Sequence, residues 1–576
     1  MASSASLTLT QRARAVQRGA RLALVALALA CGFVVGAGCV PRQTALHEPP
    51  GPFTGGPPRR GGHAVFVREE DPDYLDPALS YGAYSAPMIE GVFRTLLEYV
   101  NAPGVAGATL RPELTTSLPD IREGGTLYCF RIRPDAKFGP PLHRHITAAD
   151  FKYSLERLFR IGSPGIGFYR EIVGADRVIA GKDSALAGVI ARGDSLYVRI
   201  QHSDPVFLQE LTMSFSAPIP REVAERYSGT FSQHTVSSGP FMVAEFVPRQ
   251  RVLLVRNPDW CGEPAYLDTF EIRLGVTAAN AVALIRRGEA DGGMFEVPAA
   301  EFPRLLRDST WRHQVDVEDG LNTEYLYMNV EQPPFNDVRV RQAINWAIDR
   351  RPILKVWSGK GVAAGEFLPP GMPGASALHA YMPADPARAR RLLAEAGYPN
   401  GFSTTLYGWT IEPGPRQLTV IQQQLANVGI HARLDLGEVT GYTSMAEDTS
   451  RHIGFGLYSW YADYVDPSNF CDVLLNGRRL QAIHNEDLSM MNDPRLNAMI
   501  VEAMATAEPT LRAARWRAVD SLTMVEAPVA PLLHHYDSRL YSPRIGGWYR
   551  HITRILMIDK LWIKSPPSAP VAQAAR

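Results

Sequence analysis

The segment that says most about the fold is Pro333-Pro334-Phe335-Asn336-Asp337-Val338-Arg339-Val340-Arg341-Gln342-Ala343, which runs on to Ala347-Ile348-Asp349-Arg350. Asn336-Asp337 is a helix N-cap signal, because these side chains accept hydrogen bonds from the free N–H groups of a first turn. The two prolines ahead of it favour an extended backbone. Apolar residues then recur at helical spacing from Val340 to Ile348. The segment predicts an extended entry followed by a helix whose buried face spans 340–348.

Strand and helix patterns alternate on both sides of this segment. Short apolar or alternating runs predict strands at 64–67, 126–132, 241–246, 252–256, 269–274, 325–329 and 529–533. Apolar periodicity predicts helices at 83–99 and 278–287. Thr147 and Asp385 stand where helix N-caps are expected. We therefore predict an α/β chain with mixed sheets.

Composition excludes several classes of protein. The chain has 576 residues, of which 45% are apolar, and this can bury a large core, so a disordered or fibrous chain is excluded. The 59 Lys and Arg equal the 59 Asp and Glu, which argues against a nucleic-acid partner, since such partners require a positive surplus. The five cysteines show no CxxC pair, so no disulfide framework or zinc module is expected.

The first forty residues are typical of an export signal. Four arginines between 12 and 21 precede the apolar run 22–35, which is shorter than the about 20 residues of a membrane span. Gly36-Ala37-Gly38-Cys39 resembles the bacterial lipobox, in which the cysteine is lipidated, although Gly36 stands where the lipobox has Leu. We predict a lipoprotein signal peptide at 1–38, and a lipidated Cys39 with a Pro/Gly-rich tether at 39–60. A plain secretory signal, with Cys39 incidental, is the alternative.

Catalytic motifs are missing from the sequence. It has no GxSxG, HExxH or Walker A segment. The close histidine pairs, His143 with His145 and His534 with His535, lack companion Cys or Glu ligands for a metal ion. We therefore predict that the protein is not an enzyme and has no cofactor and no metal site. An unrecognised hydrolase stays open as an alternative.

A series of short motifs follows the same order as in a known family. The motifs are Gly61-Gly62, Asp73–Ala78, Glu90–Leu97, Arg111–Leu114, Thr147–Arg157, Ser238–Phe241, Arg256–Trp260, Gly288–Asp291 and Pro333–Arg350. In this order they resemble the bacterial extracellular solute-binding proteins of family 5, which are the oligopeptide- and dipeptide-binding proteins of ABC importers. The motifs are mostly structural, so they identify a fold without identifying a ligand.

The resemblance implies a two-lobed periplasmic-binding-protein fold with mixed sheets in each lobe and a hinge that the chain crosses twice. Lobe one would comprise 61–317, with an inserted subdomain around 105–215, and lobe two 318–526. The chain would return to lobe one at 527–564 and end in a disordered tail at 565–576. Ligand would be held in the cleft and released when the lobes swing apart.

The resemblance also implies a ligand-binding residue. In peptide-binding members an Asp in a "(A/G)DY…DP…F" segment pairs with the peptide's N-terminal ammonium, and Asp463 takes this position here. A purely local role of Asp463 in capping the next turn is the alternative. The glycine-containing strand 454–460 could pair with an extended peptide. The aromatic residues predicted to line the pocket are Tyr458, Trp460, Tyr461, Tyr464 and Trp409.

These observations predict the substrate-binding subunit of an ABC transporter, which captures peptides and delivers them to a permease. Its permease and ATP-binding subunits would be separate chains. The protein would be a monomer in the cell envelope, periplasmic or extracytoplasmic, and would meet the membrane only through its lipid. The same scaffold binding an oligosaccharide, opine or chelated metal, or acting as a sensor without a transporter, remains an alternative.

Lipidation at Cys39 makes a direct prediction. Cys39→Ser should move the protein from the membrane fraction to the soluble fraction, because serine lacks the thiol to which the lipid would be attached. Cell fractionation followed by immunoblotting measures this. Identical partitioning of the variant and the parent protein would contradict lipidation at this residue.

Overall fold

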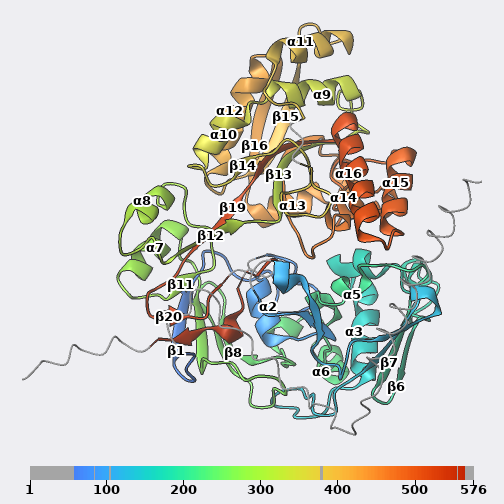
Figure 1. Cartoon of the computed structure of the whole chain (residues 1–576), viewed down its shortest axis with the longest axis vertical. Coiled ribbons are helices and arrows are strands. Elements are labelled where there is room, and N and C mark those ends of the chain that lie inside the picture. The colour runs from blue at the N-terminus through green and yellow to red at the C-terminus, as the bar shows by residue number, and fades with distance from the viewer. Residues whose placement is uncertain are drawn as a thin grey trace, which may run out of the picture. The chain divides into compact units, whose positions relative to one another are not determined.

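Three larger sheets and the helices packed on them dominate the computed structural model, which describes residues 57–564 apart from 84, 103–104, 377–379, 550 and 554–555 (Figure 1). The described residues belong to one compact unit, Pro50–Arg576. The predicted signal peptide, Cys39, most of the tether and the predicted tail 565–576 lie outside the described residues. None of the helices that the structure describes is both long and apolar enough to cross a membrane.

The five-stranded sheet contains the first strand of the body. Its order is β11 (Gly292–Gly293), β1 (His63–Val67), β10 (Thr269–Arg273), β9 (Arg251–Arg256) and β8 (Phe241–Val247). Strand β1 runs parallel to β10 and β11, whereas β8, β9 and β10 are antiparallel, so the sheet is mixed as predicted. The predicted strands 64–67, 241–246, 252–256 and 269–274 are thus confirmed.

The helix predicted at 83–99 is shorter in the structure. Helix α2 (Ala86–Val92) ends at Phe93, which has an extended backbone, and the chain then forms β2 (Leu97–Tyr99) against β3 (Leu110–Pro112). The physical reason is an ion pair across these strands, since Arg111 Nε donates to Glu98 Oε1 at 2.8 Å. Glu98 is buried and would lose this partner if the helix continued.

A four-stranded antiparallel sheet lies next in the sequence. Its order is β4 (Asp120–Arg122), β5 (Leu127–Arg131), β7 (Ser195–Arg199) and β6 (Val189–Arg192). Helix α3 (Ala148–Ile161) begins at the predicted capping box of Thr147 and Asp150. On this helix Arg157 pairs with Asp76 through two hydrogen bonds of 2.9 and 2.5 Å. The pair holds the Asp73–Ala78 motif against α3.

The six-stranded sheet forms the core of the second half. Its order is β14 (Val362–Ala363), β18 (Val529–His534), β13 (Asn322–Met328), β17 (Phe455–Tyr461), β15 (Phe402–Trp409) and β16 (Ile430–Gly437). Helices α9 (Val338–Ala347), α10 (Arg350–Val356), α11 (Pro386–Glu395) and α12 (Gly414–Ala426) accompany it. Asp337 caps α9 as predicted, accepting from Arg339 N at 2.8 Å. The helix ends one residue earlier than its predicted face, because Asp349 caps α10 by accepting from Arg351 N at 3.0 Å.

Two strands connect the five-stranded and six-stranded sheets. Strand β12 (Val315–Asp319) pairs antiparallel with β19 (Tyr536–Leu540). The chain continues from β12 into β13, and later from β18 into β19. It therefore crosses twice between the five-stranded and six-stranded sheets, as predicted. Because β18 is hydrogen-bonded to β13, the return crossing falls at His535 and not at 527. The other predicted domain limits stay predictions.

Other α-helices and short strands lie around these sheets. Near the four-stranded and five-stranded sheets they are α4 (Ala175–Ile179), α5 (Phe207–Glu210), α6 (Arg221–Arg226), α7 (Ala278–Arg286), α8 (Phe302–Arg307), β20 (Ile545–Gly546) and β21 (Trp562–Ile563). In the second half they are α13 (Val439–Ala446), α14 (Ser468–Leu475), α15 (Pro494–Met504) and α16 (Pro509–Glu526).

Candidate binding cleft

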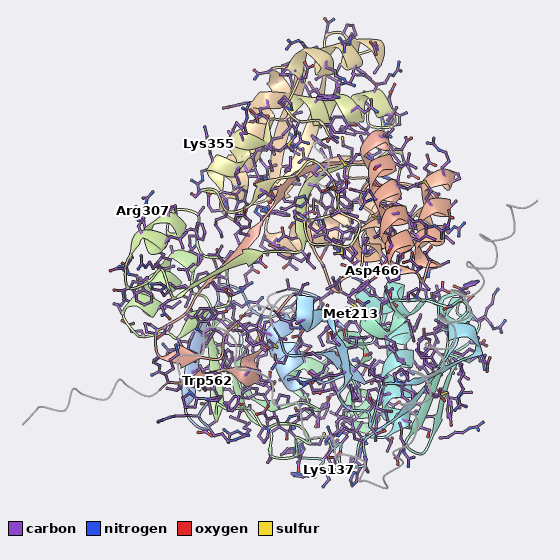
Figure 2. All side chains as sticks on the ribbon, in the orientation of Figure 1. Lys137, Met213, Arg307, Lys355, Asp466 and Trp562 are labelled. Carbon is purple, nitrogen blue, oxygen red and sulfur yellow. The ribbon has the colours of Figure 1, made fainter. Side chains whose placement is uncertain are left out.

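A cavity of about 460 Å³ lies between segments from the two ends of the chain. From the N-terminal part, the segment 79–83, the start of α2 and residues 212–215 line it. From the second half, α13, the end of β17 and residues 462–463 line it. Figure 2 labels Met213, which lines the cavity beside α5, and Asp466, which precedes α14 on the facing side. The cavity is therefore the cleft that the two-lobed fold predicts.

Asp463 lies in this cleft, just after the end of β17. Its carboxylate oxygen Oδ2 accepts hydrogen bonds from Tyr81 Oη and from Asn469 Nδ2, both at 2.9 Å. Asn469 Oδ1 accepts in turn from Asp463 N at 2.9 Å and from Trp460 Nε1 at 3.0 Å. The first turn of α14 and the loop before α2 thus orient the carboxylate together.

The electrostatic state of Asp463 follows from its burial. Burial raises the pKa of Asp463 to about 6, against the opposing effect of the hydrogen bonds from Asn469 and Tyr81. The second oxygen, Oδ1, has no hydrogen-bond donor among the described residues. The group is a carboxylate that gains from a cation placed in the cleft.

Aromatic rings surround Asp463. Tyr458, Trp460 and Tyr461, all predicted from the sequence, line the cavity. Tyr81 and Phe215 line it too, and the ring of Tyr81 lies 5.4 Å from that of Phe215 and 6.2 Å from that of Trp460. Sequence analysis missed Tyr81 and Phe215. The signal for Tyr81 was its place directly after the Asp73–Ala78 motif, whereas Phe215 carries no local signal.

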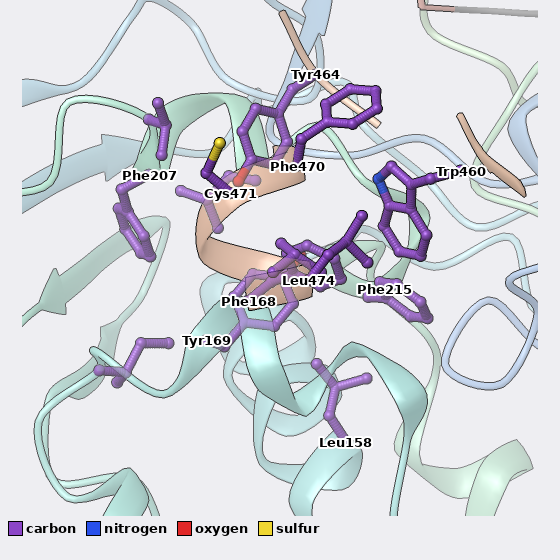
Figure 3. Close-up of a cluster of buried hydrophobic side chains, with 14 of the residues drawn as sticks. Leu158, Phe168, Tyr169, Phe207, Phe215, Trp460, Tyr464, Phe470, Cys471 and Leu474 are labelled. Atoms are coloured by element: carbon purple, nitrogen blue, oxygen red, sulfur yellow. The ribbon is translucent and has the colours of Figure 1, made fainter. Parts of the chain in front are cut away.

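Two of the predicted aromatic residues lie elsewhere. Tyr464 is buried in the apolar cluster of Figure 3, and its hydroxyl accepts from Ser468 Oγ at 3.3 Å. Trp409 ends β15 and packs edge-on against Tyr442 at 6.2 Å. Neither ring belongs to the cavity lining. The pattern of aromatic residues did not distinguish rings in the core from rings in the cleft, because both positions are largely apolar.

One edge of β17 is open where it borders the cleft. Strand β17 pairs with β13 over its whole length, from Phe455 to Tyr461. On its other side it pairs with β15 only at Gly456. Within the described residues, the stretch 458–461 therefore has one edge without a strand partner. Its backbone groups are suitable for pairing with an extended peptide.

Acidic side chains that sequence analysis missed also line the cavity. Glu447 follows α13 and accepts from Tyr458 Oη at 2.9 Å, while Glu486 lies in the loop after α14. Glu447 and His484 approach to 3.9 Å, and this contact raises the pKa of His484. These residues come from separate segments with no shared motif, so only the folded chain brings them together.

Comparison with known proteins agrees with this architecture. The model of the bacterial extracellular solute-binding proteins, family 5 Middle, matches residues 109–481. The chain belongs to this family. The recognition made from the sequence motifs is thereby confirmed.

The chain resembles individual family members over most of its length. It is 27% identical to heme-binding protein A of Haemophilus influenzae, over 84% of this chain and 89% of that protein. It is 25% identical to the periplasmic oligopeptide-binding protein OppA of Escherichia coli, over 81% of this chain and 84% of that protein. The structure of the periplasmic binding protein DppA from Helicobacter pylori with the peptide STSA superposes with a TM-score of 0.76, at 23% identity and covering 88% and 99% of the two chains. These likenesses confirm the two-lobed family 5 fold.

The Asp466-Pro467 turn has a structural role in this family 5 protein. Asp466 receives two hydrogen bonds from Arg512, of 2.9 and 2.8 Å, and both side chains are buried. Asp466→Asn should lower the free energy of unfolding by about 3–5 kcal/mol, because it leaves the Arg512 guanidinium buried without its counter-ion. Guanidinium-induced unfolding followed by tryptophan fluorescence measures this. Asp463→Asn is the matched control and should change stability far less, and equal losses for the two variants would contradict this assignment.

Proposed function

We propose that the chain captures peptides in the cleft and delivers them to an ABC permease formed by separate chains. The observation that carries the proposal is the Asp463 carboxylate, which is oriented by Tyr81 and Asn469 and keeps Oδ1 without a donor among the described residues. An N-terminal ammonium would complete its hydrogen bonding in a poorly hydrated site. Two relatives, the oligopeptide-binding protein OppA and the H. pylori DppA bound to a peptide, support the same ligand class.

The open edge of β17 supplies the second part of the recognition. Backbone groups of an extended peptide would pair with residues 458–461, and this pairing does not depend on the peptide's side chains. Closure of the lobes would then enclose the peptide, and opening would release it. Recognition through the backbone and one ammonium favours broad rather than narrow sequence specificity.

The remaining features of the proposal concern how the protein works in the cell. We take it to act as a monomer in the cell envelope, anchored through lipid at Cys39, and to release its ligand unchanged. The family and its named relatives are binding proteins, which agrees with a role without catalysis.

Other solutes fit this cleft less well. One relative is named heme-binding protein A, but a heme brings two carboxylates and no ammonium, so it would place negative charge near Asp463 without supplying a cation. A neutral oligosaccharide could stack on Trp460 and Tyr461, yet it would leave the desolvated Asp463 carboxylate without a cation.

The ammonium pairing can be tested with one substitution and two ligands. Asp463→Asn should weaken binding of a free tripeptide such as Ala-Ala-Ala by about 2–5 kcal/mol, or roughly 30-fold to several-thousand-fold. The loss should be much smaller for N-acetyl-Ala-Ala-Ala, which has no ammonium. Calorimetry with both ligands on both proteins isolates the pair. Equal losses for the two ligands would make Asp463 a structural residue, and absence of any peptide binding would refute the proposed function.

The pKa of Asp463 predicts how affinity depends on pH. The pKa of Asp463 is about 6 without a ligand. A bound ammonium would lower this pKa, because it stabilises the carboxylate. Affinity should therefore be greatest near pH 7 and fall below pH 6, by about tenfold between pH 7 and pH 5. Above about pH 8 it should fall again, because the α-amino group of the peptide loses its proton. Calorimetric titration across this range measures the decline. Asp463→Asn should remove this component, and an identical pH profile for variant and parent would contradict the assignment.

A further inference from the structure

The polar lining of the cleft carries a surplus of negative charge. Among the described residues that line the cavity there are six carboxylates and no Lys or Arg. The carboxylates are Asp73, Glu90, Glu447, Asp463, Glu486 and Asp537. A ligand that brings positive charge gains attraction in such a cavity, and a ligand that brings a carboxylate finds no side-chain cation other than an imidazole.

Several of these carboxylates already have partners within the chain. Asp73 accepts hydrogen bonds from Ser80 Oγ, Tyr81 N and Gly82 N, each at 2.8 Å. Glu447 accepts from the hydroxyl of Tyr458. The proposed peptide ammonium would complete Asp463. Glu486 differs from these three carboxylates, because its oxygen Oε2 has no hydrogen-bond partner among the described residues.

Glu486 has a carboxylate that the described residues leave incomplete. Its oxygen Oε2 is enclosed by protein and has no hydrogen-bond partner there. Burial raises the pKa of Glu486 well above its ordinary range, and the charges of Glu447 and Asp463 raise it further. The opposing cation is Arg479, but this guanidinium is already bound to Asp472 at 2.5 Å and lies over the ring of Phe168. An enclosed carboxylate without a partner is costly, and a cation in the cavity would remove that cost.

Glu447 is next to Glu486 on the same wall of the cavity. The backbone N–H of Asn485 donates to the carbonyl of Glu447 at 3.1 Å, which ties the loop that carries Glu486 to the end of α13. The ring of Tyr458 joins this wall through its hydrogen bond to Glu447. The carboxyl groups of Glu447 and Glu486, together with the ring of Tyr458 on β17, form a suitable environment for an ammonium or guanidinium group.

We propose that Glu486 and Glu447 form a second cation subsite, and that the cleft prefers peptides with a Lys or Arg side chain in addition to the N-terminal ammonium. This inference rests on the proposed function, because Asp463 takes the first cation. A metal ion does not fit the subsite, since no three His, Cys, Asp or Glu side chains of the described residues are placed to hold one. A free diamine carries the same two cations as a lysine-containing peptide, so the experiment must distinguish a diamine from a peptide as the ligand.

The test compares lysine with its uncharged analogue. Lys-Ala-Ala, Ala-Lys-Ala and Ala-Ala-Lys are each titrated by calorimetry beside the same peptide containing Nε-acetyl-lysine, which keeps the lysine chain, adds an acetyl group and loses the charge. At least one lysine peptide should bind about tenfold or more tightly than its acetylated counterpart. In Glu486→Gln this ratio should fall to near one. In Glu412→Gln, an exposed carboxylate paired with Arg416 and outside the cavity, the ratio should stay as in the parent protein.

Further arms separate this inference from the proposed function. Asp463→Asn should weaken the lysine and acetyl-lysine peptides alike and keep their ratio. Equal binding of all lysine and acetyl-lysine pairs to the parent protein would overturn the second subsite while leaving the role of Asp463 intact. No peptide binding at all would overturn both. Binding of 1,5-diaminopentane as tight as that of the best lysine peptide would overturn the peptide as the source of the two cations.

A stability measurement separates ligand recognition from folding. Glu486→Gln keeps the shape of the side chain and removes a carboxyl group whose charged form is disfavoured by burial, so the Tm of the ligand-free variant should equal or exceed that of the parent protein. A lower Tm together with an unchanged lysine ratio would assign Glu486 a structural role and overturn the subsite.

Discussion

The cleft depends on how two strands cross between the sheets. Asn322 is fully buried at this crossing and forms a reciprocal pair with the backbone of His535, donating through Nδ2 to the carbonyl at 3.0 Å and accepting from the N–H through Oδ1 at 2.8 Å. The side chain thus takes the place of a backbone partner at the point where both strands leave one sheet for the other. Because the pair holds the crossing strands in register, it sets where the end of β17 faces the segment before α2.

Apolar contacts join the two sides of the cleft. Figure 3 shows Phe470 and Leu474 of the α14 segment in the same cluster as Phe168 and Phe215 from the N-terminal half. The carboxyl groups beside this cluster are themselves buried, and that burial makes them costly to keep charged. The same burial therefore favours a ligand that brings a cation to these carboxyl groups. Desolvation raises the pKa of Asp463 and of Glu486 for one physical reason.

The two acidic positions differ in how the chain supports them. Asp463 is oriented by Asn469, six residues later on the first turn of α14, and by Tyr81 from the other half of the chain. Glu486 has no comparable support among the described residues. A carboxylate with oriented donors suits a group that every peptide shares, namely the ammonium. A carboxylate without them suits a group that only some peptides carry.

Local signals in the sequence determined the elements and the family. The N-caps at Asp337, Thr147 and Asp385 act within one turn of a helix, and the alternating strands 241–246 and 252–256 act within one hairpin, so each could be predicted from neighbouring residues. The motif order then identified the family and, by position, Asp463. The helix at 83–99 was wrong in its second half because Glu98 finds its partner in Arg111 on another strand.

Tertiary structure alone decided which side chains share the cleft. Tyr464 and Trp460 are four residues apart and both belong to the buried apolar cluster, yet only Trp460 also lines the cavity. Tyr81, Glu447 and Glu486 come from segments far apart in the sequence, and no local pattern connects them. Burial is a property of the folded chain, so the raised pKa of Asp463 and the unpartnered oxygen of Glu486 could not be predicted from residue types and spacing.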